Sequence, residues 1–407
     1  MSKNMKMIRF IDNEINKINN IVFAFLMKFE LVHIQKDVGQ IPINLCKTGY
    51  NVTLVTYLQN KNIKKIDGVK IVKIGEDNLI DNRLIDFKFI YYILKNAKNI
   101  DWIIGYKVSP TYVITSFIFK LLKRRGIFIV KMDSNGRLYV EKIFRGEDGK
   151  FLYKRNFISL SLLRFIGNLI FRILNLTCNF IIIESPEARK RVLSYHPYLK
   201  KKLIVLQNGT DGSLWDVYIT KFKRKKRGEK SKKILFVGSI IHRKGVDLLL
   251  KAFYRLGDKF PDWKLELIGE MPPLFKNKIK RLISKLGNKV ILTKFVTQED
   301  LARKYMEAEI FCLPSRNEAS SLVLFEAMYF GKAIVASDIG SAKYNLNYGK
   351  AGLIFENENL NELTEKLEQL MKNDYLRKKL GKEAGKRCRK LFTWKEIITQ
   401  LDNYMIC

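Results

Sequence analysis

Residues 309–340 read "EIFCLPSRNEASSLVLFEAMYFGKAIVASDIG". The opening apolar run predicts a strand that ends near Pro314 and Ser315. After the loop "RNEAS", the run "SLVLFEAMYF" predicts a helix that Gly331 stops, and "AIVAS" (333–337) predicts a second strand. A strand, a helix and a strand in this order are typical of parallel pairing. They predict a sheet that binds ligands at the carboxyl ends of its strands.

The same alternation extends outward from this stretch. Further strands are predicted at 234–240, 264–270, 289–295 and 352–356, and in the first half at 21–27, 50–57, 101–106, 126–132, 180–185 and 202–208. Helical patterns fall between them, including 38–48, 110–125 and 186–194. The sequence therefore predicts an α/β protein with two Rossmann-like, doubly wound domains facing each other across a cleft.

A composition change marks the boundary between the two domains. The segment "KFKRKKRGEKSKK" (221–233) holds nine basic residues and one acidic residue. It predicts a solvated crossing between domains, although a nuclear signal or a nucleic-acid-binding tail has the same composition. The predicted division is a first domain at 1–205, a basic linker at 206–233, a second domain at 234–390 and a C-terminal helix at 391–407.

The charge of the chain predicts an anionic partner. The 407 residues include 75 Lys and Arg against 40 Asp and Glu, a formal net charge of +35. Residues 1–205 alone hold 36 basic and 16 acidic side chains, which is +20. Nucleic acid, an anionic membrane and phosphorylated small molecules all fit such a charge. Because neither an aromatic-basic RNA motif nor a zinc pattern occurs, a nucleic-acid partner is not expected.

The cysteines and the N-terminal region indicate the cellular compartment in which the protein is expected. Five scattered cysteines suggest neither a zinc site nor a disulfide framework, so a reducing cytoplasm fits best. The apolar run "IVFAFLM" is interrupted by Lys28 and Glu30, which argues against a signal peptide or a spanning helix.

The segment 155–176 is predicted to form the most hydrophobic helix of the chain. Its polar residues Arg164, Asn168, Arg172 and Asn175 recur at spacings of three and four, so one polar stripe crosses a broad apolar body. Two arginines make it a poor membrane span, yet suit it to lie in a membrane interface. Burial as an ordinary domain helix is the competing interpretation, and we favour it.

The helix inside 309–340 predicts an anion site. Ser320 or Ser321 is the expected N-cap, and the free amides of the first turn suit a phosphate or diphosphate. Glu326, a little over one turn into the helix, could accept hydrogen bonds from the hydroxyls of a ribose, and Glu318 from those of a second sugar. Two sugars joined through a diphosphate describe a nucleotide-sugar. Alternatively, the two glutamates are a solvated helix residue and a loop charge.

A second loop points to the same anion. The strand at 234–240 leads into Gly238, a short loop, and Lys244 with Gly245 before a helix. Gly238 lets the backbone approach a ligand, and Lys244 can place its charge on a phosphate. Both loops follow strands of one sheet, so they are expected to converge.

With these motifs, nearly all of residues 20–404 resembles the GT-B glycosyltransferases, specifically the large retaining family 4. That family has a Gly-Arg-x(4)-Lys-Gly loop and a Glu-x(7)-Glu motif, and this chain shows "PSRNEASSLVLFEAMYFGKAIVASDIGS". The resemblance also includes "VLQNGTD" (205–211), "LIGEMP" and the terminal "FTWKEIITQLDNYM". It implies an acceptor-binding first domain, a donor-binding second domain, and a last helix that packs back on the first.

The resemblance assigns roles to the residues of the second domain. Glu326 corresponds to the ribose ligand, Glu318 to the contact with the transferred sugar, and Lys244 to the diphosphate cation. The amides around Ser321 and Leu322 correspond to the phosphate cradle.

In the first domain, Gly39 resembles the glycine of the loop that faces the phosphates. Asp133, in "FIVKMDSNG", stands nearest to the place where many relatives keep an active-site histidine. It could touch the donor sugar or the incoming hydroxyl, or it could be a turn-forming residue.

The chain departs from the family pattern at two places. Ser239 stands where many members have a second diphosphate cation, an arginine, and Arg243 is the substitute at a different spacing. Ala319, Ser320 and Ser321 replace Gly-Phe-Gly, which narrows the room near the sugar.

The implied reaction is retaining transfer of a sugar from a UDP- or GDP-linked donor to an acceptor hydroxyl in glycan, glycolipid or lipid-linked saccharide synthesis. Neither a metal nor another cofactor is expected. A cytoplasmic enzyme at the inner face of the membrane fits the basic first domain. A nucleotide-sugar 2-epimerase, a phosphorylase and a non-catalytic nucleotide-sugar binder are the alternatives.

Overall fold

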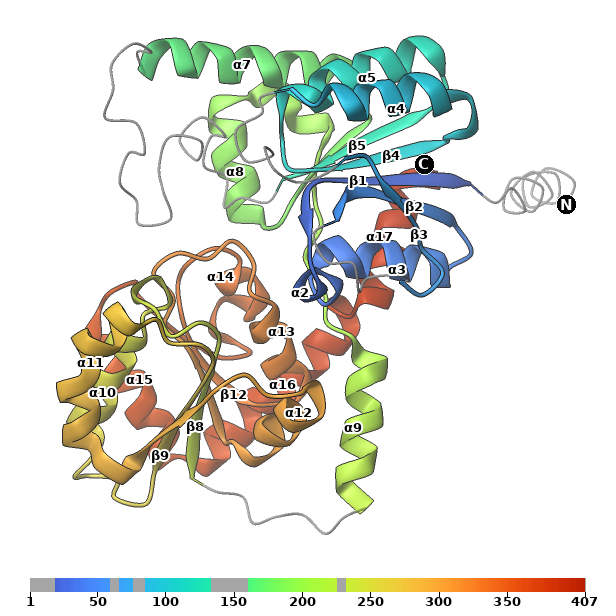
Figure 1. Cartoon of the computed structure of the whole chain (residues 1–407). Coiled ribbons are helices and arrows are strands. Elements are labelled where there is room, and N and C mark those ends of the chain that lie inside the picture. Colours follow the sequence, from blue (N-terminus) through green and yellow to red (C-terminus); the bar gives the residue numbers. More distant parts are fainter. Residues whose placement is uncertain (1–18, 59–65, 76–84, 133–159, 225–231, 407) are drawn as a thin grey trace, which may run out of the picture. The chain divides into compact units, whose positions relative to one another are not determined.

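The structure of the chain is a computed structural model that describes residues 19–58, 66–75, 85–132, 160–224 and 232–406. The chain divides into two compact units. The first unit comprises Met1–Ile183 and Arg189–Leu206, and the second comprises Glu184–Ala188 and Gln207–Cys407. Each unit is built around one parallel sheet (Figure 1).

The sheet of the first unit has seven strands in the order β3-β2-β1-β4-β5-β6-β7. The strands are β1 (Asn20–Phe29), β2 (Asn51–Leu58), β3 (Lys70–Lys73), β4 (Trp102–Tyr106), β5 (Ile127–Lys131), β6 (Phe180–Ile183) and β7 (Leu203–Val205). Every neighbouring pair is parallel. The sequence predicted six of these strands and missed β3, whose two outer residues are exposed and whose two inner residues are half-buried.

The helices of the first unit lie on two faces of this sheet. They are α2 (Leu31–Ile34), α3 (Asp37–Lys47), α4 (Phe87–Asn96), α5 (Pro110–Leu122), α7 (Leu160–Thr177) and α8 (Pro186–Tyr195), with the short η2 (Ala97–Asn99) and η3 (Pro197–Lys201). From β1 the chain first moves toward β3 and then back past β1 toward β7. Since parallel crossovers are right-handed, this reversal puts α3 on one face and α4, α5 and α7 on the other (Figure 1).

The sheet of the second unit has six strands in the order β10-β9-β8-β11-β12-β13. They are β8 (Lys233–Val237), β9 (Lys264–Ile268), β10 (Val290–Thr293), β11 (Ile310–Leu313), β12 (Ala333–Ser337) and β13 (Leu353–Phe355), all parallel. All six were predicted from the sequence. Successive residues of β8, β11 and β12 alternate between two buried hydrophobic clusters, one on each face of the sheet.

The helices of the second unit cover both faces of its sheet. They are α9 (Gly212–Arg224), α10 (Val246–Leu256), α11 (Pro273–Leu286), α12 (Gln298–Glu307), α13 (Leu322–Tyr329), α14 (Ala342–Asn345), α15 (Leu360–Lys372), α16 (Asp374–Leu391) and α17 (Trp394–Ile406), with η4 (His242–Lys244), η5 (Gly287–Lys289) and η6 (Asn347–Gly349). One cluster packs α10, α11 and α15 on the sheet, and the other packs α9, α12 and α13. That the last helix packs on the first domain stays a prediction.

The segment predicted as a linker at 206–233 differs from that expectation. Helix α9 occupies Gly212–Arg224, and residues 225–231 lie outside the described part of the chain. Trp215 is 2% exposed, donates a 2.7 Å hydrogen bond to Thr210 and joins the core of the second unit. Apolar residues at Trp215, Tyr218, Ile219 and Phe222 give the helix one face that packs. The basic composition at 221–233 hid this pattern.

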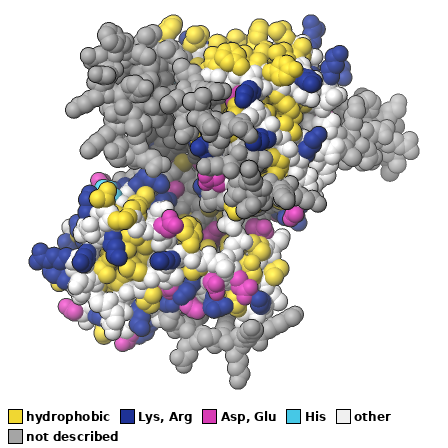
Figure 2. All heavy atoms as spheres, in the orientation of Figure 1, with side chains coloured by type: hydrophobic (Ala, Val, Ile, Leu, Met, Phe, Trp, Pro, Cys, Tyr) yellow, Lys and Arg dark blue, Asp and Glu magenta, His cyan; other side chains and the backbone are white. Residues whose placement is uncertain are grey.

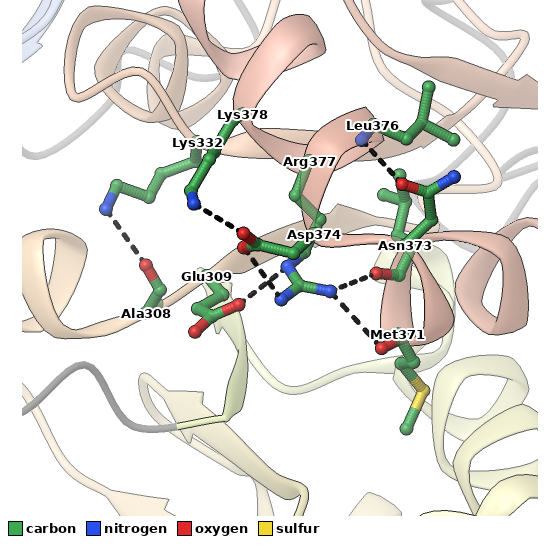
Figure 3. Close-up of polar contacts among 10 residues, drawn as sticks. Ala308, Glu309, Lys332, Met371, Asn373, Asp374, Leu376, Arg377 and Lys378 are labelled. Carbon is green, nitrogen blue, oxygen red and sulfur yellow. Dashed lines mark hydrogen bonds and ion pairs between the residues drawn. The ribbon is translucent and has the colours of Figure 1, made fainter.

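Arg377 connects α16 to the sheet of the second unit, at the edge where the strands begin (Figure 3). Its guanidinium lies 2.6 Å from Glu309, the residue before β11, and donates a 2.6 Å hydrogen bond to the carbonyl of Leu370 at the end of α15. It also lies over the ring of Trp263. Because this edge is opposite to the carboxyl ends of the strands, these contacts stabilise the fold away from the predicted site.

Among the described helices, none is both long enough and apolar enough to cross a bilayer. Helix α7 comes from the predicted segment 155–176, of which residues 155–159 are not described. It has two apolar sides. Phe171 and Leu174 are buried, whereas Leu176 is 77% exposed.

Candidate functional site

The strand order of the second unit locates the candidate site. From β8 the chain proceeds to β10 on one side and returns to β11 on the other side of β8. The loops that follow β8 and β11 therefore leave the sheet in opposite directions, and open α/β sheets bind ligands at such a point, outside the carboxyl ends of the strands. These are the two loops in which the sequence predicted the donor-binding residues, and the amide of Arg316 donates a 2.9 Å hydrogen bond to the carbonyl of Arg243 between them.

Two glycines allow neighbouring loops to approach each other closely. Gly245 brings the loop after β8 against the loop after β11, and Gly340 brings the loop after β12 against it. Gly245 has φ +69°, and a Cβ there would lie 1.8 Å from the carbonyl oxygen of Pro314. Gly340 has φ +61°, and its Cβ would lie 2.2 Å from the carbonyl oxygen of Glu318. Any side chain at either position would push the loops apart. The motif predicted the first glycine, but not the second.

Arg316 joins the two loops through its side chain. It donates hydrogen bonds of 2.6 and 2.9 Å to the two carboxylate oxygens of Asp247, and one of 2.6 Å to the carbonyl of His242. Its Nε donates to Glu358 at 2.7 Å. Burial alone would raise the pKa of Asp247, but the bonds from Arg316 hold that pKa below its usual value. Sequence reasoning missed this bidentate pair, because nothing local marks residues 69 positions apart as partners.

Lys244 and Glu318 form an ion pair at the centre of this arrangement. The ammonium of Lys244, at the end of η4, contacts Oε2 of Glu318, and the hydroxyl of Ser315 lies 3.4 Å from the same oxygen. The side chains of Lys244 and Glu318 are 15% and 17% exposed. The structure thus brings together two residues to which the sequence gave separate partners, a diphosphate and a sugar. Both remain accessible from solvent.

The start of α13 supplies donors beside this pair. Ser321 is the N-cap, as predicted, and its side chain makes no capping bond. The hydroxyl oxygen of Ser320 is enclosed and hydrogen-bonds to no group in the part of the chain that the structure describes. First-turn amides such as that of Leu322 have no carbonyl partner within the helix. Together with the helix dipole, these groups suit an anion.

Glu326 lies one turn further along α13 and faces α12. Part of the residue reaches the surface, yet its carboxyl is densely surrounded by protein. Burial raises the pKa of this carboxyl to about 7, although the 2.9 Å hydrogen bond that Tyr305 donates to it opposes the shift. Burial and the nearby Glu326 in turn raise the pKa of Tyr305. The sequence predicted Glu326 but not Tyr305, whose ring is stacked on Phe330 within the core.

The remaining predicted residues of the second unit lie along the first loop. Gly238 follows β8 directly with φ +140°. Ser239 is exposed. Arg243, the predicted substitute for the missing arginine, donates a 3.2 Å hydrogen bond to the carbonyl of Asn317 in the neighbouring loop. Its guanidinium therefore lies next to the backbone that carries Glu318.

In the first unit, Gly39 lies within the first turn of α3 rather than in a loop. A Cβ at this position would lie 2.5 Å from Cα of Ile34, so glycine is needed for α2 to approach α3. Near it, Asp37 pairs with Lys131 at 2.7 Å, at the end of β5. Asp133 lies outside the described residues. Sequence reasoning passed over the buried pair between Asp37 and Lys131.

No three His, Cys, Asp or Glu side chains cluster as metal ligands within the described ranges of the chain. The candidate site offers a cation, backbone donors and two carboxylates, of which Glu318 is already paired with Lys244. That the reaction needs no metal stays a prediction.

The comparisons with known proteins agree with the fold. Residues 218–387 match the family described as Glycosyl transferases group 1. A glycosyltransferase from Rickettsia africae superposes with a TM-score of 0.72 at 17% identity, covering 96% of this chain and 98% of that one. HepE of Anabaena, in complex with UDP-glucose, superposes with a TM-score of 0.68 at 14% identity, covering 95% and 99%. The predicted GT-B architecture of two Rossmann-like domains is confirmed.

Among curated proteins, mannosylfructose-phosphate synthase of Agrobacterium fabrum is 25% identical over 236 residues, which are 55% of this chain and 52% of that protein. The chain spans about half the length of the curated relatives that it matches. The family match lies in the second unit, where the loops after β8 and β11 converge.

Proposed function

Because the chain carries a glycosyl transferases group 1 domain at residues 218–387, we propose that the protein is a retaining glycosyltransferase. It moves a sugar from a UDP- or GDP-linked donor to an acceptor hydroxyl. Support for such a donor comes from HepE of Anabaena, a neighbour in fold that is described with UDP and with UDP-glucose.

The ion pair between Lys244 and Glu318 beside the start of α13 carries this proposal. A diphosphate bears more charge than one carboxylate, so it competes for the ammonium of Lys244. The displaced carboxylate of Glu318 is then able to accept hydrogen bonds from sugar hydroxyls. Donor binding thus exchanges one partner of Lys244 for another, and it frees Glu318 for the transferred sugar.

The reaction breaks the bond between the anomeric carbon and the diphosphate oxygen and forms a bond from that carbon to the acceptor oxygen. The acceptor proton passes to the departing phosphate oxygen, so attack occurs on the face that the diphosphate leaves. Negative charge grows on the diphosphate during this step. Lys244 and the amides of Ser321 and Leu322 stabilise that charge in fixed positions, which is the main expected source of rate.

Glu326 recognises the ribose in this proposal. Its carboxyl lies one turn beyond the amides that hold the diphosphate, on the same helix. As a carboxylate it accepts hydrogen bonds from both ribose hydroxyls, and Tyr305 already holds one of its oxygens in place. Hydrogen bonds to the charged form lower the pKa of Glu326, so donor binding favours the ionised state.

The acceptor is assigned to the first unit. A sugar or a lipid-linked saccharide fits a strongly cationic half of the protein. We propose that the enzyme works in the cytoplasm at the inner face of the membrane, without a metal ion.

Calorimetry with UDP, GDP and their sugar conjugates tests the proposal. Wild-type protein is expected to bind one nucleotide series, whereas Glu326→Ala loses that binding while its circular dichroism shows an intact fold. Glu383→Ala, an exposed glutamate on α16, is the matched control and binds as wild type does. Unchanged nucleotide affinity in Glu326→Ala would contradict the assigned role of this residue.

A transfer assay with lipid extracts then separates the proposed reaction from its alternatives. Donor consumption without any acceptor would indicate an epimerase. Nucleotide-sugar binding without consumption under any condition would indicate a non-catalytic binder.

A further inference from the structure

The first unit carries an extensive exposed apolar surface on three neighbouring helices. We define the apolar face as the exposed side chains of Phe87, Tyr91 and Leu94 on α4, of Phe117, Leu121 and Leu122 on α5, and of Phe165, Leu169 and Leu176 on α7. Helix α5 contacts both α4 and α7, so the three sets lie side by side. Figure 2 shows hydrophobic side chains gathered over this part of the molecule, with Lys and Arg around them.

The spacing of these residues shows that each helix is apolar on two sides. On α4, Phe87, Tyr91 and Leu94 recur at four and three residues and are 73%, 65% and 51% exposed. The intervening Phe89 and Ile93 are buried against the unit. A helix that covers a sheet in water normally has a polar outer side. The outer side of α4 is apolar instead, and α5 repeats the pattern. On α7 the exposed Phe165, Leu169 and Leu176 share their side of the helix with Arg172.

Among the residues that the structure describes, the charge on and beside these three helices is mostly positive. The sequences of α4, α5 and α7 contain no Asp or Glu. Exposed basic side chains accompany them: Lys88, Lys95, Lys98, Arg124, Arg125 and Arg172. Of the nearby acidic residues, Asp86 is buried as the N-cap of α4, and Asp101 pairs with Lys123 at 2.8 Å.

Several basic residues gather at one end of the apolar face. Lys123, just past α5, donates a 3.3 Å hydrogen bond to the carbonyl of Lys98, just past α4, which places the carboxyl ends of both helices together. Arg124 and Arg125 follow directly and are exposed. Apolar side chains bordered by cations form the pattern of proteins that lie in a membrane interface.

We propose that the apolar face docks on an anionic lipid bilayer, with its hydrophobic side chains at the acyl boundary and its Lys and Arg side chains among the anionic headgroups. Two observations favour this partner. A second copy of the chain would bring two surfaces of the same charge together, which is unfavourable. A nucleic acid would leave the exposed leucines and phenylalanines without apolar partners.

The inference rests on the proposed function for the location at the inner face of the membrane, and it adds the surface of the first unit that binds there. It does not depend on the donor site, so the two proposals can fail separately. It also combines the two interpretations given for the segment of α7, a helix in a membrane interface and an ordinary domain helix. That helix uses one side to pack on its unit and offers the other, with Phe165, Leu169 and Leu176, to the lipid.

Co-sedimentation of the full-length protein with vesicles tests the proposal. We expect binding to vesicles of phosphatidylcholine with phosphatidylglycerol, weak binding to phosphatidylcholine alone, and a decrease as salt is raised. The double variant Phe117→Ser/Leu121→Ser is expected to bind at least about tenfold more weakly, because it removes two apolar anchors. The charge variant Lys95→Glu/Arg125→Glu is expected to lose binding to a similar extent.

Leu274→Ser/Phe295→Ser is the matched control, since these side chains of the second unit are 83% and 74% exposed. It is expected to bind vesicles as wild type does. All variants keep the thermal unfolding profile of the wild type, because every changed side chain is exposed. They also keep nucleotide binding, so a failure of the donor site is measured separately.

Three outcomes would overturn the proposal. The first is vesicle binding that is unchanged in Phe117→Ser/Leu121→Ser. The second is an equal loss in the control variant. The third is a concentration-dependent dimer that Phe117→Ser/Leu121→Ser abolishes in a protein that does not bind vesicles, which would assign the face to a second copy.

Discussion

Each unit holds a lysine–carboxylate pair near the carboxyl ends of its strands, and the two pairs differ in their contact with water. Lys131 and Asp37 in the first unit are 1% and 8% exposed, at a separation of 2.7 Å. Lys244 and Glu318 in the second unit are 15% and 17% exposed. We call the pair between Lys131 and Asp37 the sealed pair, because solvent hardly reaches it. We call the pair between Lys244 and Glu318 the open pair, because a ligand from solvent can reach it.

Their surroundings agree with this difference. Asp37 also lies 3.4 Å from the hydroxyl of Tyr106, whose ring lies beneath the ammonium of Lys131. This pair joins α3 to β5, and opening it would leave a buried charge without a partner. Beside Lys244 and Glu318 stand the first-turn amides of α13. The pair between Lys131 and Asp37 is therefore structural, whereas the pair between Lys244 and Glu318 is, under the proposed function, the one that exchanges a partner for a ligand.

Breaking the sealed pair is expected to have the largest effect. Lys131→Met leaves the Asp37 carboxylate buried and unpaired, which should lower the free energy of unfolding by about 3–5 kcal/mol. Urea denaturation measures this loss. Lys131→Met/Asp37→Leu removes both charges and should regain most of the stability. A stability equal to wild type in the single variant would show that the pair is not structural.

Breaking the open pair should affect turnover rather than folding. Lys244→Ala is expected to lower turnover by about 10²-fold or more, because the cation that stabilises leaving-group charge is lost. Steady-state rates with the identified donor measure it. Lys251→Ala, an exposed lysine on α10, is the control and should retain the wild-type rate. Wild-type turnover in Lys244→Ala would remove this residue from the mechanism.

The fold was largely predictable because both sheets are parallel. Their strands are continuous apolar runs, and the helices between them show spacings of three and four. The exceptions have local causes. Strand β3 is short and half exposed, so it lacks an apolar run. Helix α9 has charged residues over its last turn, which concealed the apolar side that carries Trp215.

The sequence predicted those residues of the candidate site that stand in local motifs, but not the residues that they contact. Glu318, Glu326 and Lys244 stand in stretches whose spacing fixes their position on a loop or a helix. Their partners come from distant parts of the chain, such as Tyr305 for Glu326. Which charges pair depends on the order of strands in the sheet, and a single sequence does not specify it.

Arg316 supports the pair between Lys244 and Glu318 indirectly, because it joins the loops on which the two residues stand. Arg316→Lys keeps the charge but loses the planar contact with both oxygens of Asp247. We expect a loss of about 2 kcal/mol in the free energy of unfolding, together with weaker nucleotide binding. Arg255→Lys, an exposed arginine of the same unit, is the control. Full nucleotide affinity in Arg316→Lys would show that the loops hold their positions without it.

The smallest expected effect concerns pH. Glu326 has a pKa of about 7 in the folded protein, so it is mostly protonated at about pH 6 and mostly ionised at about pH 8. Because the carboxylate is the form that accepts hydrogen bonds from both ribose hydroxyls, nucleotide affinity should rise roughly tenfold over this range. Calorimetry at several pH values measures the rise.

Glu326→Gln isolates this effect, since its amide does not titrate and its affinity should stay constant over the same range. The stability of the fold supplies an independent check, because the contribution of Glu326 to stability falls with rising pH while nucleotide affinity rises. The folded state binds a proton more tightly than the unfolded chain, so the contribution of Glu326 to stability falls as pH rises from its ordinary pKa of 4.5 to about 7. Glu326→Gln should therefore gain stability over wild type at high pH, and less at low pH. A wild-type pH profile in Glu326→Gln would mean that another group titrates, and that the ribose is recognised elsewhere.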